Sequence, residues 1–213
     1  GIAIKPKGVI AIEHFLILRN IMYRGIYNHR INEICTWILE NIFKKIRTEF
    51  KDKIWIDDCL RSWIFTPQSL DIKNFLSNDD IRLYYHLSKW EEEAPKPIST
   101  LCGMFMNRRL LKASNIDFLN NIDKLELLAF ARKKAAKLNF DPTLFCGIKE
   151  KNFNGFESNN SLKVWNGHTL KDLDTESALI RILIENQENS LLIYPACIQE
   201  DILKEITKIK EKI

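Results

Sequence analysis

Apolar residues in the first half of the chain recur at helical spacing. Between residues 7 and 29 they form a surface wide enough for a buried helix, and between residues 30 and 50 they form one stripe that includes Ile34, Ile38 and Ile42. The next stretch is divided by Ser and Asp residues suited to helix capping and by prolines that end helices. The pattern predicts further helices at 57–65, 69–76, from the cap at 77–80 to residue 93, and 99–107.

The pattern changes after about Arg108. Short apolar segments typical of strands then alternate with amphipathic stretches. We therefore predict a mainly α fold, with a helical segment over residues 1–108 and a small α+β region over 109–213 that holds a short antiparallel sheet of three or four strands. The predicted strands are 109–113, 144–148, 162–165 and 191–194, and the predicted helices of this region are 122–138, 175–186 and 199–212.

The first six residues, Gly1-Ile-Ala-Ile-Lys-Pro, alternate apolar and polar positions like the end of a strand. No strand precedes them, so the apolar pair Ile2 and Ile4 would be exposed. This indicates that a partner surface is missing and that the chain is part of a larger fold.

Charge and cysteine usage narrow the function classes. The 32 basic and 28 acidic residues leave a net charge of +4 without a long basic run, which argues against nucleic-acid binding but is compatible with one local anion pocket. The five cysteines are odd in number and form no CxxC pair, so we predict free thiols in the reducing cytoplasm. No apolar run is long enough to span a membrane.

The sequence does not predict a metal site. The four histidines (His14, His29, His86 and His168) are isolated, without HxH or HxxxH spacing. The acidic pairs at 57–58 and 79–80 lie at predicted helix starts, where capping explains them.

Arg19, Tyr23 and Tyr27 recur every four residues within the first predicted helix. This spacing places a guanidinium and two phenols on one helix face. An arginine fork suits a phosphate, and a tyrosine suits a sugar or a base. The alternative interpretation is that both tyrosines are packing residues and Arg19 is a surface cation.

A second basic element, NRRLLK, spans residues 107–112. Arg108, Arg109 and Lys112 either form a solvated basic edge or contact an anion. Both interpretations stay open on the residues alone.

The segment AIEHFLILRNIMYRGIYNHR, residues 11–30, resembles a motif of the HD-domain phosphohydrolases related to deoxynucleoside triphosphate triphosphohydrolases. NRRLLK resembles the family's basic element, and residues 173–195 resemble its closing stretch, with Ser177, Leu183 and Tyr194-Pro195. The matching positions of the first motif are Ala11, Ile12, Glu13, Phe15, Leu16, Arg19, Met22, Tyr23, Tyr27 and His29, while Leu18 and Arg30 depart from the usual Ala and Lys.

The resemblance implies hydrolysis of a dNTP to a deoxynucleoside and triphosphate, assisted by a divalent metal (Mn, Mg, Fe or Zn). It also implies that Arg19 contacts the triphosphate and that Tyr23, Tyr27 and the adjacent Asn28 line the nucleotide pocket. Arg108, Arg109 and Lys112, which lie in the segment that resembles the family's basic element, are candidates for an anion or regulatory contact. Family members are commonly homo-oligomers, which is the expectation for this chain.

The chain departs from the family in one large respect. The His and Asp metal ligands of the family lie before the helix at residues 11–30, and this sequence has no counterpart of them. The resemblance therefore implies the C-terminal half of such an enzyme, with no catalytic residue or bound metal of its own and an HD-motif half or subunit as partner. The alternative is a non-catalytic nucleotide-binding or assembly module that pairs with a separate HD subunit.

Overall fold

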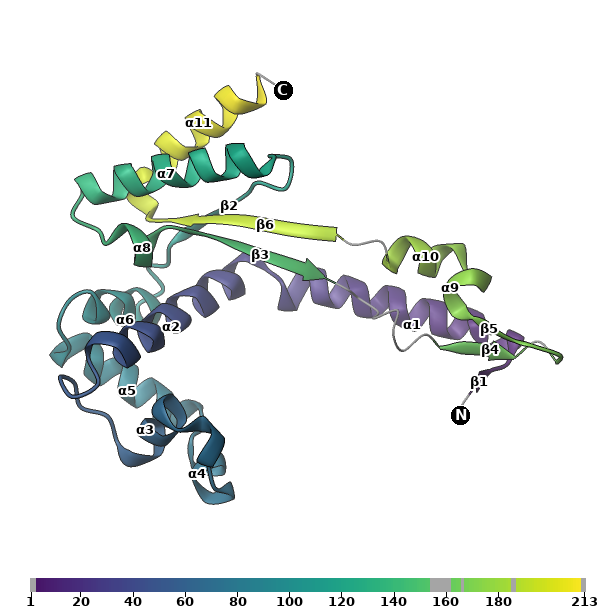
Figure 1. The fold of residues 1–213 in the computed structure, drawn as a ribbon, viewed down its shortest axis with the longest axis horizontal. Helices are drawn as coiled ribbons and strands as arrows, with labels where there is room; N and C mark the ends of the chain where they lie inside the picture. The colour runs from purple at the N-terminus through teal and green to yellow at the C-terminus, as the bar shows by residue number, and fades with distance from the viewer. Residues whose placement is uncertain (1–2, 154–161, 166, 185–186, 212–213) are drawn as a thin grey trace. The chain divides into compact units, whose positions relative to one another are not determined.

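Figure 1 shows the fold as a computed structural model, which describes residues 3–153, 162–165, 167–184 and 187–211. The described residues are mainly helical, as predicted. The helices are α1 (Val9–Met22), α2 (Arg30–Glu49), α3 (Asp58–Phe65), α4 (Ile72–Ser77), α5 (Asp80–Glu93), α6 (Ile98–Met106), α7 (Asn121–Lys137), α8 (Pro142–Phe145), α9 (Leu173–Glu176), α10 (Ala178–Ile184) and α11 (Gln199–Lys210). None of the helices in these ranges is both long and apolar enough to cross a membrane.

The strands form two sheets where the sequence predicted one. The first sheet has the order β1-β4-β5 and the second the order β2-β6-β3. The predicted small α+β region with a short sheet is confirmed, and the second sheet was not predicted because β1 and β5 are too short to show a period in the sequence. The strands are β1 (Ala3–Ile4), β2 (Lys112–Asn115), β3 (Gly147–Phe153), β4 (Lys163–Trp165), β5 (Leu170–Asp172) and β6 (Gln187–Tyr194).

The chain folds into two compact units, each built from separate stretches of sequence. Unit 1 comprises residues 1–32, 115–118 and 150–191, and unit 2 comprises residues 33–114, 119–149 and 192–213. The division at residue 108, which was drawn from helix and strand content, remains a prediction.

Unit 1 is built around one face of α1. Leu16 on that face belongs to a small core with Val164 of β4, Leu173 of α9 and Ile180 of α10. β1 pairs in parallel with β4, and Ile4 packs against the same core. The N-terminal strand thus has its partner later in the chain, which corrects the expectation that Ile4 lacks one; Ile2 lies outside the described residues.

Unit 2 contains the main core. The α2 stripe that the sequence predicted is buried, and Ile38, Ile42 and Ile46 have no exposed surface. Trp90 of α5 and Ile98 of α6 pack in the same cluster. On the α2 side the indole Nε1–H of Trp37 donates to the Leu144 carbonyl at 3.0 Å.

The starts of α3 and α5 confirm the caps that the sequence predicted. Asp57 caps α3 by accepting from the Leu60 N–H at 2.8 Å, and Asp79 caps α5 by accepting from the Arg82 N–H at 2.9 Å. Two predicted starts were wrong. The helix predicted from residue 69 begins at Ile72, with Asp71 as its cap, and the helix predicted from residue 99 begins at Ile98.

One predicted strand was also wrong in part. Leu144 and Phe145 end the short helix α8, and the strand begins at Gly147. Asp141 caps this helix by accepting from the Thr143 N–H at 2.9 Å. Asp141 precedes Pro142, and that dipeptide is a helix-start signal because proline suits the first helical position. The apolar run after it does not distinguish a buried helical turn from a strand.

Candidate functional site

The helix α1 continues into a π-helix at Tyr23–Tyr27, and the predicted site residues lie across this junction. The Asn28 N–H donates to the Tyr23 carbonyl at 2.7 Å, five residues back, which is the π-helical pattern. Single π-helical turns occur frequently at functional sites. Gly25 lies in the middle of the turn. The sequence predicted the helix but not its wider turn.

Arg19, Tyr23 and Tyr27 lie in contact, in line along the helix, and are called the ladder below. The Arg19 guanidinium lies over the Tyr23 ring, 5.2 Å from its centroid. The Tyr23 and Tyr27 ring centroids are 5.0 Å apart, with an angle of 44° between the rings. The structure therefore brings together the three side chains that the four-residue spacing selected.

The ladder lies at the surface of unit 1. Arg19 is exposed, Tyr23 is half-buried, and Tyr27 keeps 54% of its surface exposed. This cation–π contact does not use the N–H donors of the guanidinium for a hydrogen bond to the ring. Among the described residues no hydrogen bond or ion pair to the Arg19 guanidinium is found, while the Arg19 backbone carbonyl accepts from the Tyr23 N–H. The arrangement can therefore present a positioned fork to an anion and a phenol ring to a flat ligand.

Asn28 lies at the end of the π-helix, where its backbone closes the turn. The amide of Asn32, four residues on, donates to the Ile26 carbonyl at 2.7 Å. These contacts fix the backbone around Tyr27. Asn28 follows Tyr27 directly in the chain and is half-buried. It stays the predicted fourth residue of the site.

The second predicted element lies in unit 2, after the end of α6. Arg108, Arg109 and Lys112 are all exposed, and Arg108 adopts a left-handed backbone with a φ of 53°. Glycine is the usual residue in that conformation, so an arginine there costs about 1 kcal/mol. A cation beyond a helix C-terminus is also stabilised by the helix dipole. The position of Arg108 is thus explained without a ligand, and the anion contact remains a prediction.

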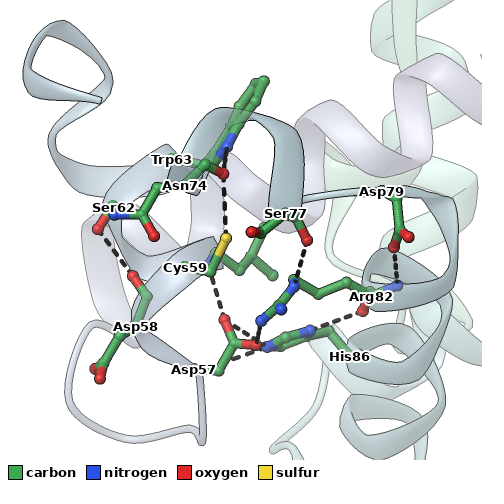
Figure 2. Close-up of polar contacts among 11 residues, drawn as sticks. Asp57, Asp58, Cys59, Ser62, Trp63, Asn74, Ser77, Asp79, Arg82 and His86 are labelled. Atoms are coloured by element: carbon green, nitrogen blue, oxygen red, sulfur yellow. Dashed lines mark hydrogen bonds and ion pairs between the residues drawn. The ribbon is translucent and has the colours of Figure 1, made fainter. Parts of the chain in front are cut away.

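A third group, which the sequence did not reveal, joins α3 to α5 in unit 2. Figure 2 shows Asp57 facing Arg82 and His86. We call these three residues the clasp. The Arg82 guanidinium forms an ion pair with the Asp57 carboxylate, and its Nε–H donates to the Ser77 carbonyl at 2.7 Å. The clasp residues are 25 and 29 positions apart in the chain, so no local pattern marks them.

The hydrogen bonds of the clasp fix the state of His86. The Asp57 N–H donates to Nε2 at 3.2 Å, so Nε2 carries the lone pair. Nδ1 then carries the proton and donates to the Arg82 carbonyl at 2.8 Å. The ring is fully buried and stacks on Trp55, with centroids 4.8 Å apart. Both ring nitrogens are therefore used within the fold.

The clasp contains residue types typical of catalysis, yet its groups bind one another. Asp57 caps α3, pairs with Arg82 and donates its N–H to His86. Cys59 next to it donates its thiol to the Asn74 carbonyl at 3.2 Å. The arrangement holds α3 and α5 together and therefore has a structural role.

Cysteine thiols and potential metal ligands also occur along the chain. Burial raises the pKa of Cys102 and of Cys146 to about 12, so both stay protonated at neutral pH. Burial also raises the pKa of Cys35, while the positive charge of Arg108 opposes this. All five cysteines are free, and three of them, Cys59, Cys102 and Cys146, are buried. In the ranges that the structure describes, no group of three or more His, Cys, Asp or Glu side chains could hold a metal ion.

Comparisons with known proteins identify the fold type. No protein-family model matches the chain. A crystal structure of a phosphohydrolase (BT4208) from Bacteroides thetaiotaomicron matches with a TM-score of 0.67 and 21% identity, over 90% of this chain and 51% of that one. A hypothetical protein from Aquifex aeolicus matches with a TM-score of 0.64 and 21% identity, over 96% of this chain and 47% of that one. The chain is thus similar in fold to a phosphohydrolase and spans about half the length of these structures.

One curated relative is similar in sequence. The uncharacterized protein YwfO of Bacillus subtilis (strain 168) is 25% identical over 113 residues, which cover 52% of this chain and 26% of that protein. The matched part is a quarter of that relative, so this similarity does not establish an activity for the chain.

Proposed function

We propose that this chain supplies the nucleotide-binding part of a metal-dependent phosphohydrolase that converts a dNTP to a deoxynucleoside and triphosphate. The observation that carries the proposal is the ladder, in which a guanidinium and two phenol rings lie in successive contact at a helix surface. The likeness in fold to a phosphohydrolase supports the reaction class. The resemblance of residues 11–30 to the triphosphohydrolase motif supports the substrate.

Each ladder residue has a separate role in this proposal. Arg19 binds the phosphates through its N–H edge, because planar donors match two phosphate oxygens. Tyr23 holds the guanidinium in place through the contact with its ring. Tyr27, the more exposed ring, contacts the sugar and base, and Asn28 lies next to it.

The metal ligands are assigned to a companion HD-type segment. The described residues of this chain do not fit a divalent cation, because they contain no cluster of donor side chains. The contribution of this chain is therefore to hold the nucleotide. Arg108, Arg109 and Lys112 are proposed as a separate contact for a regulatory anion, since all three are exposed cations within five positions of one another.

Calorimetric titration of the chain with dGTP, GTP and pyrophosphate tests the binding role. We expect Arg19→Ala to weaken dGTP binding at least tenfold, because a charge-assisted phosphate contact contributes about 1.5–3 kcal/mol. Arg19→Lys keeps the charge but loses the fork, so its affinity should be intermediate. Arg61→Ala, which removes a half-buried arginine of unit 2 that pairs with Asp52, is the matched control and should bind like the unaltered chain. Failure of the unaltered chain to bind any nucleotide would refute the role.

A joined form tests the catalytic role. The chain linked to an HD-motif half should release triphosphate from dGTP in Mn²⁺ or Mg²⁺, and the chain alone should not. Nucleotide binding without hydrolysis in the joined form would instead identify a non-catalytic binding module.

A further inference from the structure

The π-helical turn carries a side-chain contact that the roles proposed for the ladder residues do not use. The amide of Asn32, in the first turn of α2, donates from Nδ2 to the Ile26 carbonyl at 2.7 Å. The His29 N–H reaches the same carbonyl only at 3.4 Å, which is longer than is typical of a backbone hydrogen bond. The Asn32 amide is therefore the better-placed donor for this carbonyl.

The contact from Asn32 to Ile26 depends on the break between the π-helix and α2. In a continuous α-helix, two residues six positions apart lie about 9 Å apart along the axis and on different sides of it, which is too far for an asparagine side chain. The backbone of Asn28 leaves the regular helical conformation, with a φ of −96° and a ψ of 17°, and α2 begins at Arg30. The break lets Asn32 reach back, and the hydrogen bond in turn holds the end of the π turn.

The π turn affects where Tyr27 lies relative to Arg19. In an α-helix four residues rotate the chain by about 40° more than a full turn, so a regular helix would offset Tyr27 from Arg19 by about 80°. A π-helical hydrogen bond spans one residue more, so each residue of the turn rotates the chain by less. The offset of Tyr27 is therefore smaller, and its ring centroid lies 5.0 Å from that of Tyr23. The π turn thus helps to keep the ladder in line.

We propose that Asn32 is a positioning residue, which holds the π turn through the Ile26 carbonyl and so sets the Tyr27 ring where a nucleoside base can stack on it. This inference rests on the proposed function and adds what lets the site distinguish a nucleotide from an inorganic polyphosphate. Arg19 lies in α1 and contacts Tyr23 at the start of the π turn. The phosphate end of the ladder therefore does not depend on Asn32, and the base end does.

Two substitutions remove the amide donor of Asn32. Asn32→Asp has the same shape but only accepts hydrogen bonds when ionised, and a carboxylate in the first turn of a helix suits the helix dipole. Asn32→Ala removes the amide without adding a charge. Because Asn32 is exposed, both variants should stay folded. Asn32→Gln keeps an amide donor and tests for rescue. Asn120→Asp, at the exposed cap of α7 in unit 2, is the matched control.

Nuclear magnetic resonance of the chain with isotope-labelled tyrosine rings follows the position of Tyr27. The Tyr23 and Tyr27 ring centroids are 5.0 Å apart, so a cross-peak between their ring protons is expected in the unaltered chain. The cross-peak should be lost in Asn32→Asp and Asn32→Ala, and kept in Asn32→Gln and Asn120→Asp. A cross-peak that survives in both variants without the donor would overturn the proposal.

Calorimetric titration with dGTP and with pyrophosphate measures the consequence for binding. We expect loss of the Asn32 donor to weaken dGTP binding about fivefold, which is less than removal of the Tyr27 ring should cost, because the ring is displaced but still present. Pyrophosphate has no base, so its affinity should not change. Equal losses for the two ligands would indicate a general distortion of the site and would overturn the proposal, as would unchanged dGTP binding in both Asn32→Asp and Asn32→Ala.

Failure of this inference is distinguishable from failure of the proposed function. If Arg19→Ala loses dGTP binding while the Asn32 variants bind like the unaltered chain, the nucleotide site is retained and the positioning role of Asn32 is removed. If the unaltered chain binds no nucleotide, the proposed function fails, and the cross-peak between Tyr23 and Tyr27 still decides whether Asn32 holds Tyr27 in place.

Discussion

The ladder of unit 1 and the clasp of unit 2 are both built from side chains that bind ligands in other proteins, but they use them differently. In the clasp, Asp57, Arg82 and His86 are hydrogen-bonded to one another and to the backbone of two helices. In the ladder, Arg19 and Tyr27 are exposed at a helix surface. The clasp has the residue types of an active site, and the ladder has the accessible donors of one.

The difference separates polar groups whose hydrogen bonds are satisfied within the fold from polar groups that stay accessible, which residue type alone does not do. A buried polar group must be paired, and once paired it stabilises the fold. An exposed, pre-positioned group adds little stability and is available to a ligand. Substitutions in the two regions should therefore affect different measurements.

The largest expected effect is on the clasp. Arg82→Ala removes the partner of the Asp57 carboxylate, which is 24% exposed, and the bond to Ser77. We expect the free energy of unfolding to fall by about 2–3 kcal/mol, less than for a fully buried pair because solvent screens the charge left behind. Urea denaturation measures it. Asp79→Ala, which removes only the cap of α5, should cost about 1 kcal/mol. Equal losses in the two variants would mean that the clasp adds nothing beyond capping.

The next effect is in the core of unit 2. A Cβ at Gly147 would lie 2.0 Å from Cη2 of Trp37, and the hydrogen bond from Trp37 to Leu144 holds that ring in place. Gly147→Ala should therefore destabilise the protein by about 2 kcal/mol through overpacking. Thermal unfolding checks it against Gly25→Ala, because no atom lies within 4 Å of a Cβ at Gly25. An unfolding midpoint for Gly147→Ala no lower than that of Gly25→Ala would contradict the packing.

A smaller effect, on nucleotide affinity, distinguishes the role of Tyr27 from that of Arg19 at the other end of the ladder. Tyr27→Ala removes the exposed ring and should weaken dGTP binding about tenfold, because stacking of a base on an aromatic ring contributes roughly 1–3 kcal/mol. Binding of pyrophosphate should not change, since it has no base. Tyr27→Phe keeps the ring and serves as the control. If Tyr27→Ala lowered the affinities for dGTP and for pyrophosphate equally, Tyr27 would contact the phosphates instead.

The smallest effect depends on pH and concerns Asp141 of unit 2. Burial acts to raise the pKa of this carboxyl, but hydrogen bonds from Thr143 and Leu144 and the charge of Lys45 outweigh it and lower the pKa. The ionised cap therefore stabilises the fold above the ordinary pKa of Asp, near 4, and this stabilisation is lost as the pH falls through the lowered value.

The corresponding variant is Asp141→Ala. It should lose about 1 kcal/mol at pH 7, with a smaller loss in strong acid. Urea denaturation at a series of pH values measures the difference from the unaltered chain. A difference that grows as the pH falls would have the wrong sign for this explanation.

The parts of the structure that the sequence predicted are those set by neighbours in the chain. The caps at Asp57 and Asp79 and the α2 stripe depend on residues within a few positions, so they could be read directly. The ladder contacts could be anticipated for the same reason, because a spacing of four residues suffices to bring side chains together on a helix.

The features that were missed depend on distant residues or on short elements. The clasp joins positions 57 and 86, and β1 of two residues finds its partner at Lys163 and Val164. Neither leaves a period in the sequence. The π-helix at Tyr23–Tyr27 was missed because no residue pattern separates it from an α-helix. Tertiary contacts determine the clasp and the β1–β4 pair.

The most direct test of the account measures binding and stability together in two variants, Arg19→Ala and Arg82→Ala. We predict that Arg19→Ala weakens dGTP binding at least tenfold and changes the free energy of unfolding by less than about 1 kcal/mol. Arg82→Ala should lower that free energy and leave dGTP affinity within about twofold while the protein stays folded. The contradicting result is unchanged dGTP binding in Arg19→Ala, or its loss in folded Arg82→Ala.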